Sequence, residues 1–152
     1  YKQHMEKIGF EVTPCNSPHE VASECNLIIT ATASEDFILS IDDILEGTHI
    51  NAIGSDTPSK RELGPGIIEK ADLVIADSIE QCKNIGEIAC SIKDGNLNLD
   101  NVVELGDVLS GKISGRESKS QITLSDLNGV AVQDIKIANS VFKKFMEDKN
   151  EI

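Results

Sequence analysis

Short apolar runs separated by helix-like segments restrict the fold of this chain more than any other feature. Three such runs occupy residues 27–32, 49–53 and 73–76. The first and the third lack alternating polar residues, which is typical of strands buried on both faces of a parallel sheet. Strands that alternate with helices predict an α/β fold with a parallel sheet and right-handed crossovers.

Helix signals lie between and around these strands. Ser17, followed by Pro18 and Glu20, has the pattern of a helix N-cap. Further helices are expected at residues 1–8, 66–70, 78–92, 102–109 and 135–148. The last of these is amphipathic, because its apolar residues recur at helical spacing.

Two further segments are predicted to be extended, at residues 10–13 and 121–133. Ser59 to Glu62 has the sequence of a capping box, which predicts a helix start. Gln133 and Asp134 are expected to form the N-cap region of the last helix.

The charge of the chain excludes one class of partner. Its 26 acidic residues against 14 basic ones give a formal net charge of −12. An acidic surface repels phosphate backbones, so we expect no nucleic-acid partner. The apolar runs are too short to span a membrane, and no signal peptide is visible. We therefore expect no membrane association.

The cysteines indicate neither a metal site nor a disulfide framework. Cys15, Cys25, Cys82 and Cys90 form no C-x-x-C pair, and the histidines have no metal-like spacing. We therefore expect no metal and interpret all four cysteines as small buried hydrophobic residues. Scattered thiols without an export signal are typical of a reducing cytoplasm.

The beginning of the chain has the pattern of a helix that is already under way. Tyr1, Met5 and Ile8 share one helical face, and Gly9 follows as a C-cap. We expect the chain to be a piece of a longer protein.

The glycine-rich loop that marks most dinucleotide-binding domains is absent. Gly64 and Gly66 form a G-x-G, but position 69 is Glu69 and no strand directly precedes them. Either the fold binds no nucleotide, or the half of the sheet that carries the loop lies outside this chain.

Residues 50–63, INAIGSDTPSKREL, carry the strongest functional signal. A strand that ends in Gly54 and releases Asp56 and Lys60 onto a turn has the layout of a site at the carboxyl end of a parallel sheet. The same residues also suit an ordinary turn, in which Asp56 accepts a backbone N–H and Lys60 is a solvated lysine. Thr32, after the preceding strand, has an equally simple interpretation as a strand end.

Three motifs together resemble the ornithine cyclodeaminase/mu-crystallin family. They are residues 50–63, residues 106–116 (GDVLSGKISGR) and residues 121–134 (QITLSDLNGVAVQD). The resemblance implies the C-terminal part of a Rossmann-like, doubly wound and mainly parallel sheet without its glycine-rich loop. It divides the chain into a partial NAD(P)-binding domain (1–134) and a C-terminal helix (135–152), which we expect to pack on a missing domain or a dimer partner.

The resemblance also implies roles for individual residues. Asp56 stands at the position of the family's catalytic aspartate. The implied cofactor-binding residues are Thr32, Ala52, Ile53, Gly54, Ser55 and Lys60. Leu127 replaces a serine of the family's late motif and cannot supply a hydroxyl group. Arg116 could bind an anion or hold its loop in place, but we expect an ordinary surface arginine.

The implied function is that of an NAD-dependent cyclodeaminase (an ammonia-lyase) or amino-acid dehydrogenase. The cofactor is NAD(P), with NAD favoured, and the substrate is a small amino-acid-like molecule. An amine is oxidised to an imine, an amine or water attacks, and ammonia leaves, with Asp56 as general base. A mu-crystallin-like protein that binds NAD(P) and a small ligand without catalysis is the alternative. We expect the 152 residues alone to be inactive and to form a homodimer or self-associate.

Overall fold

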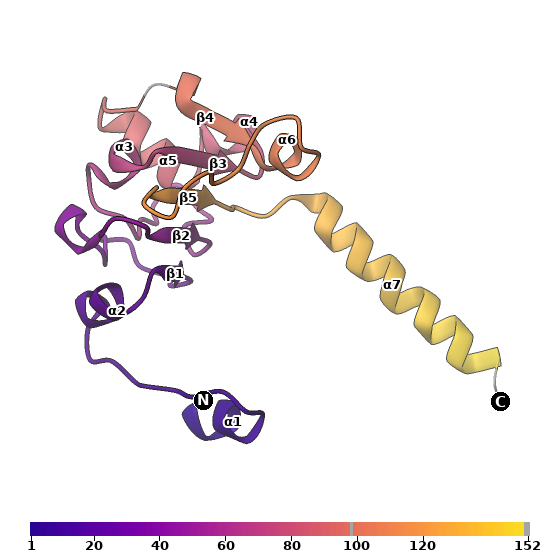
Figure 1. The fold of residues 1–152 in the computed structure, drawn as a ribbon. Coiled ribbons are helices and arrows are strands. Elements are labelled where there is room, and N and C mark those ends of the chain that lie inside the picture. The colour runs from indigo at the N-terminus through magenta and orange to yellow at the C-terminus, as the bar shows by residue number, and fades with distance from the viewer. Residues whose placement is uncertain (98, 151–152) are drawn as a thin grey trace.

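The computed structural model describes residues 1–97 and 99–150 and contains a five-stranded parallel sheet (Figure 1). The strands are β1 Leu27–Thr30, β2 His49–Ala52, β3 Leu73–Ala76, β4 Val102–Glu104 and β5 Thr123–Asp126. Their order is β1-β2-β5-β3-β4, so the last strand in sequence lies at the centre of the sheet. The predicted parallel α/β sheet is confirmed.

Most of the helices lie beside the sheet, while the first and the last lie away from it (Figure 1). They are α1 Lys2–Lys7, α2 Pro18–Glu24, α3 Ile67–Lys70, α4 Ile79–Cys82, α5 Gly86–Lys93, α6 Leu105–Leu109 and α7 Ala131–Asn150, with 3-10 turns η1 Ile41–Asp43 and η2 Leu99–Asn101. The predicted N-cap of α2 is confirmed, because the Ser17 hydroxyl accepts the Glu20 N–H at 3.2 Å.

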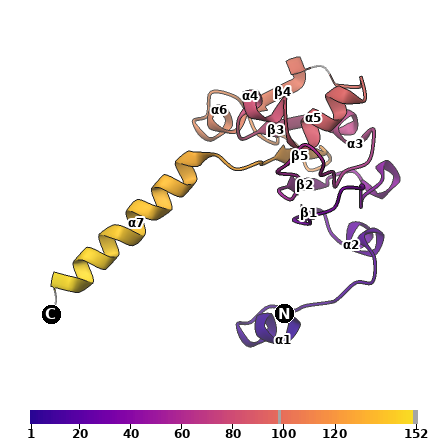
Figure 2. The ribbon, with the colours of Figure 1, turned by 180° about the vertical axis from the view of Figure 1, so that it is seen from behind.

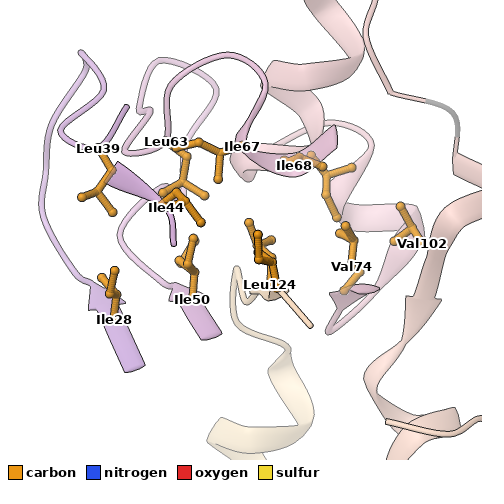
Figure 3. Packing of buried hydrophobic residues seen from close by; sticks show 14 of the residues in the cluster. Ile28, Leu39, Ile44, Ile50, Leu63, Ile67, Ile68, Val74, Val102 and Leu124 are labelled. Carbon is orange, nitrogen blue, oxygen red and sulfur yellow. The ribbon is translucent and has the colours of Figure 1, made fainter. Parts of the chain in front are cut away.

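One row of apolar side chains crosses the whole sheet. In register, its members are Ile28, Ile50, Leu124, Val74 and Val102. Figure 3 shows Leu39, Leu63, Ile67 and Ile68 packed over this row. Ile50 and Leu124 are 0% exposed, so the centre of the sheet is also the centre of the core.

Strand β1 is buried on one face only. Leu27 and Ile29 are 55% and 59% exposed, whereas Ile28 and Thr30 point into the core. The expectation of burial on both faces is wrong for β1, because β1 is an edge strand and no described element covers its outer face. The expectation holds for β3, where Val74 and Ile75 are both buried.

The helix predicted over residues 78–92 is divided into α4 and α5. Gly86 begins α5 with a φ of +90°, a conformation that favours glycine. A Cβ atom at Gly86 would also lie 2.4 Å from the Asn128 side chain and 2.7 Å from Asp126 Oδ1. The break therefore lets the end of β5 approach the start of α5.

Several other boundaries differ from the prediction. Residues 102–104 form β4 instead of the start of a helix, because Val102 and Val103 pair with β3. Residues 10–13 are not a strand, since nothing in the described chain pairs with them. The extended segment ends at Asp126, and α7 begins at Ala131 instead of residue 135. Gln133 and Asp134 thus lie inside the first turns of α7.

Helix α7 projects away from the sheet, and α1 lies apart from it at the other end of the chain (Figures 1 and 2). Exposed apolar side chains of α7 include Val132, Ile135, Ile137, Val141, Phe142, Phe145 and Met146. Packing of the predicted 135–152 helix on another domain or copy therefore stays a prediction, and residues 151–152 lie outside the described part.

The cysteines are only partly as expected. All four are free, but Cys82 alone is buried, while Cys15 and Cys25 are exposed and Cys90 is intermediate. The described residues hold no cluster of His, Cys, Asp and Glu side chains that suits a metal ion. Within the same residues, no helix has the length and hydrophobicity needed to cross a membrane.

Candidate functional site

The carboxyl ends of four neighbouring strands form one straight edge. The residues aligned there are Thr30, Ala52, Asp126 and Ala76. Hydrogen bonding continues one residue further, from Ile53 N–H to Thr30 O and from Leu127 N–H to Ala52 O, both at 2.9 Å. The loops after β1, β2 and β5 therefore leave the sheet side by side, at the edge where ligands bind in open α/β sheets.

Asp56 and Lys60 form an ion pair on the loop after β2. Lys60 Nζ lies 2.6 Å from Asp56 Oδ1, and the two side chains are 24% and 54% exposed. The hydrogen bond from Lys60 and its positive charge lower the pKa of Asp56 below its usual value. The ordinary Asx-turn is ruled out here, because its donor would be residue 58, and Pro58 has no N–H.

Glu62, which the sequence pattern predicted to be part of a helix cap, joins Thr32 and Gly54. The Glu62 carboxylate accepts the Thr32 N–H at 2.5 Å and the Gly54 N–H at 3.0 Å. The predicted capping box at Ser59 to Glu62 is wrong, because the next helix, α3, begins only at Ile67 and the Glu62 side chain is 0% exposed. Glu62 instead ties the loop after β1 to the loop after β2.

The other predicted cofactor-binding residues differ in their exposure. Ala52 and Ser55 are each 1% exposed, and the Ser55 hydroxyl donates to Lys60 O at 2.7 Å. Ile53 is 44% exposed and Thr32 is exposed. The structure thus brings all of them to one edge, but only Ile53, Thr32 and Lys60 offer accessible side chains.

An open depression of about 340 Å³ lies beside this edge, along β1. Ala31 and Thr32 contribute to its wall from the loop after β1, and Ser17 and Pro18 contribute from the start of α2. A volume of this size accommodates part of a dinucleotide or a small substrate.

Asp126 is a buried carboxyl group that the sequence analysis did not single out. It ends β5, is 0% exposed, and its Oδ2 accepts the Ile88 N–H at 2.9 Å near the start of α5. Its Oδ1 is buried without a hydrogen-bond partner among the described residues. Burial, reinforced by the negative charges of Glu87 and Asp77, raises the pKa of Asp126 to about 7.

Changing Asp126 to Asn should stabilise the fold above pH 7. Because the pKa of Asp126 is higher in the folded state, the folded chain holds a proton that the unfolded chain releases above pH 4. The stability contributed by this proton is fully present below pH 4 and is lost as the pH rises through about 7. Asp126→Asn should therefore raise the free energy of unfolding at pH 8 by about 1–3 kcal/mol.

Urea unfolding at pH 5 and pH 8 measures this effect. The advantage of the Asp126→Asn variant should shrink toward pH 5. An equal difference at both pH values would contradict the raised pKa of Asp126.

Arg116 lies away from the candidate site and holds its own loop. Its guanidinium donates to Gly47 O at 2.6 Å and to Lys119 O at 2.9 Å. Arg116 is exposed, as expected, and it also takes the alternative role of holding its loop in place.

Sequence comparison places these features in a known family. The profile of the ornithine cyclodeaminase/mu-crystallin family matches residues 1–149. This chain belongs to that family. The match extends the resemblance beyond the three motifs to both terminal helices.

Individual relatives agree with this assignment. The chain is 40% identical over 127 residues to an alanine dehydrogenase of Archaeoglobus fulgidus, covering 83% of the chain and 39% of that protein. It superposes with a TM-score of 0.85 on an archaeal alanine dehydrogenase dimer with bound NAD, at 34% identity and 97% coverage. It also superposes with a TM-score of 0.91 on the Δ1-pyrroline-2-carboxylate reductase of Thermococcus litoralis, solved with NADH and L-proline, at 28% identity and 97% coverage.

The chain spans less than half the length of these proteins, since it covers 46% of each of the two solved chains. Its five parallel strands, together with these neighbours, are consistent with the C-terminal part of a Rossmann-like fold.

Proposed function

We propose that this chain carries the catalytic half of an NAD(H)-dependent enzyme that acts on a small amino-acid-like substrate. One observation carries the proposal: the Asp56 carboxylate stands exposed and paired with Lys60 at the carboxyl edge of a parallel sheet. Membership of the family supports it, because related proteins of known structure hold NAD or NADH at 28–34% identity to this chain.

The residues present suit the nicotinamide side of such a cofactor. Ile53 offers an exposed apolar side chain, Thr32 a hydroxyl group, and Lys60 a cation for a ribose or phosphate oxygen. The depression beside Thr32 extends this surface along β1. These residues would hold the cofactor, which would supply hydride transfer at the carbon that carries the amine: a dehydrogenase would release the hydride as NADH, and a cyclodeaminase would give it back to the product.

Asp56 supplies the acid–base chemistry in this proposal. The Asp56 carboxylate is ionised at neutral pH and can accept a proton, and the ion pair with Lys60, which lowers the pKa of Asp56, makes it a weaker base than an unpaired aspartate. The proton comes from the substrate amine, or from the amine or water that attacks the oxidised carbon and displaces ammonia. Lys60 also holds the carboxylate in one orientation at 2.6 Å, which prepares it for this transfer.

The substrate carries an amine next to a carboxylate, as alanine and proline do. Whether an internal amine or water attacks decides between a cyclodeaminase and an amino-acid dehydrogenase, and both stay within the proposal. Leu127, where the family's late motif has a serine, marks this chain as a departure from that pattern.

A non-catalytic, mu-crystallin-like protein that binds NAD(P) and a small ligand is the second candidate. Its supporting observation is that Lys60 already neutralises Asp56, which is compatible with a purely binding site. The two candidates differ in turnover, because a binding protein takes up cofactor without consuming the substrate.

NAD-dependent consumption of an amino acid tests the proposal. A protein of the relatives' length that contains this segment should consume an amino acid when NAD is present, with NADH accumulating if it is a dehydrogenase and ammonia released without net NADH if it is a cyclodeaminase, whereas residues 1–152 alone should do neither. Light scattering of the same preparation should give the mass of a homodimer. NADH binding without turnover of any amino acid would favour the binding protein. Turnover by residues 1–152 alone would contradict the expectation that this segment is inactive by itself.

We also propose a cytoplasmic location, because free thiols are typical of a reducing compartment.

A further inference from the structure

Glu62 is the most completely engaged polar residue near the candidate site. It is 0% exposed, and its N–H, its C=O and both carboxylate oxygens take part in hydrogen bonds. The sequence predicted only a helix cap at this position. The observed contacts instead link three separate segments of the chain.

The side chain of Glu62 joins the two loops that carry the candidate site. One oxygen accepts the Thr32 N–H at 2.5 Å and the other accepts the Gly54 N–H at 3.0 Å. Asp56 lies two residues beyond Gly54, so the same carboxylate fixes the start of the loop that presents Asp56. The distance between Thr32 and the loop after β2, which carries Asp56, thus depends on the Glu62 side chain.

The backbone of Glu62 is itself fixed by hydrogen bonds to other segments of the chain. Its N–H donates to Glu87 Oε1 at 2.7 Å, and the second Glu87 oxygen accepts the Leu63 N–H at 3.1 Å. Its C=O accepts the Ile38 N–H at 2.8 Å. Glu87 is 1% exposed and belongs to α5, so the site loops are anchored to a helix in the core.

Gly54 shows how tightly the two loops close on Glu62. A Cβ atom at Gly54 would lie 2.4 Å from Glu62 Oε1 and 2.4 Å from Thr32 O. Any side chain there would push the loop after β2 away from the loop after β1. Glycine is therefore required at this point by space and not by an unusual φ.

Burying two carboxyl groups at Glu62 and Glu87 costs desolvation free energy that an apolar core would not cost. No lysine or arginine pairs with Glu62 or Glu87 within the described residues, and burial raises the pKa of Glu87. Well-packed apolar residues often stabilise an interior as well as buried charges do. Two buried carboxylates directly behind the candidate site are thus better explained by the geometry that they impose on it.

We propose that Glu62, backed by Glu87, is the positioning residue of the active site, an inference that rests on the proposed function. It holds the backbone of Thr32 and Gly54 at a fixed separation, so that the cofactor surface and the Asp56 carboxylate keep one mutual orientation. Because Glu62 is 0% exposed, it acts through the two loops and not by direct contact with cofactor or substrate.

The substitution Glu62→Gln tests this with little change of shape. A glutamine has one acceptor oxygen, so it can receive one of the two N–H groups and must turn its own NH₂ toward the other. Glu104→Gln is the matched control. Glu104 also accepts a backbone N–H, from Ile79 at 2.9 Å, but it lies at the end of β4, away from the site loops.

Two measurements should separate the variants. In residues 1–152, amide hydrogen exchange at Thr32 or Gly54 should become at least about tenfold faster in Glu62→Gln, while the core amide of Leu124 keeps the protection seen in Glu104→Gln. In a protein of the relatives' length, Glu62→Gln should weaken NADH binding and lower kcat together by about 10- to 100-fold, with Glu104→Gln near wild type.

The exchange measurement stands even if the protein binds no NADH, so it separates failure of this inference from failure of the proposed function. Unchanged protection at both Thr32 and Gly54 would overturn the inference. Equal NADH affinity and kcat in the two glutamine variants would also overturn it, because Glu62 would then serve stability alone. Faster exchange with no NADH binding in the wild type would instead overturn the proposed function and, with it, the assigned role.

Discussion

Changing Asp56 to Asn should lower kcat by about 10²- to 10⁴-fold in a protein of the relatives' length, the range expected for loss of a general base. Asparagine keeps the size of the side chain and can still accept the Lys60 hydrogen bond, but it cannot take up a proton. NADH affinity should stay within about threefold of wild type, because the proposed cofactor contacts are Thr32, Ile53 and Lys60 and involve no proton transfer.

Steady-state kinetics and NADH fluorescence titration check these two expectations together. Asp42→Asn is a suitable control, because Asp42 is equally an exposed aspartate but lies in η1, away from the carboxyl edge of the sheet. Since Lys60 lowers the pKa of Asp56, any acid limb of the rate that is due to Asp56 should lie at a lower pH than an unpaired aspartate would give. Full turnover in Asp56→Asn would remove the general base from the mechanism.

Changing Leu124 to Ala should destabilise the fold by about 3–5 kcal/mol. Leu124 is 0% exposed and sits in the central strand β5, between Ile50 on β2 and Val74 on β3 (Figure 3). Packing on every side leaves little room for the surroundings to collapse into the space that a shorter side chain would create. For a domain of ordinary stability, a loss of this size removes much of the free energy of unfolding.

The free energy of unfolding in urea, followed by circular dichroism, measures this loss. Leu109→Ala is the matched control, since Leu109 is 78% exposed at the end of α6 and the same substitution there should change stability by at most about 0.5 kcal/mol. Similar losses in both variants would show that the row through Leu124 is not the main core.

Strands β1, β2 and β3 could be predicted from the sequence, because their own residues favour a strand without help from distant contacts. The runs that contain Ile28, Ile50 and Val74 are apolar, short and bounded by turn residues, and each forms a strand. Residues 102–109 were less predictable, since Val102 pairs with β3 through contacts distant in sequence. The exposed face of β1 could not be foreseen either, because burial depends on what lies beside Ile29 and not on Ile29 itself.

The candidate site was predictable only in part. Asp56 and Lys60 lie together on one turn, so their spacing alone already brings them close, and the structure joins them in an ion pair. Glu62 and Asp126 were missed, because their hydrogen-bond partners are distant in sequence. Glu62 binds the N–H of Thr32, 30 residues away, and Asp126 binds the N–H of Ile88, 38 residues away. No local pattern distinguishes a buried glutamate that bonds to distant amides from an exposed one near a helix start.

The closed base of the Asp56 loop determines which part of the proposed site can vary in sequence. The Ser55 hydroxyl bonds to Lys60 O at 2.7 Å and closes the loop behind its tip. Thr57, Pro58 and Ser59 protrude beyond this closure and are exposed. In the proposed enzyme, the surface beside Asp56 can therefore be changed at the tip, by mutation or in a combinatorial library, without altering the strands or the Asp56 carboxylate.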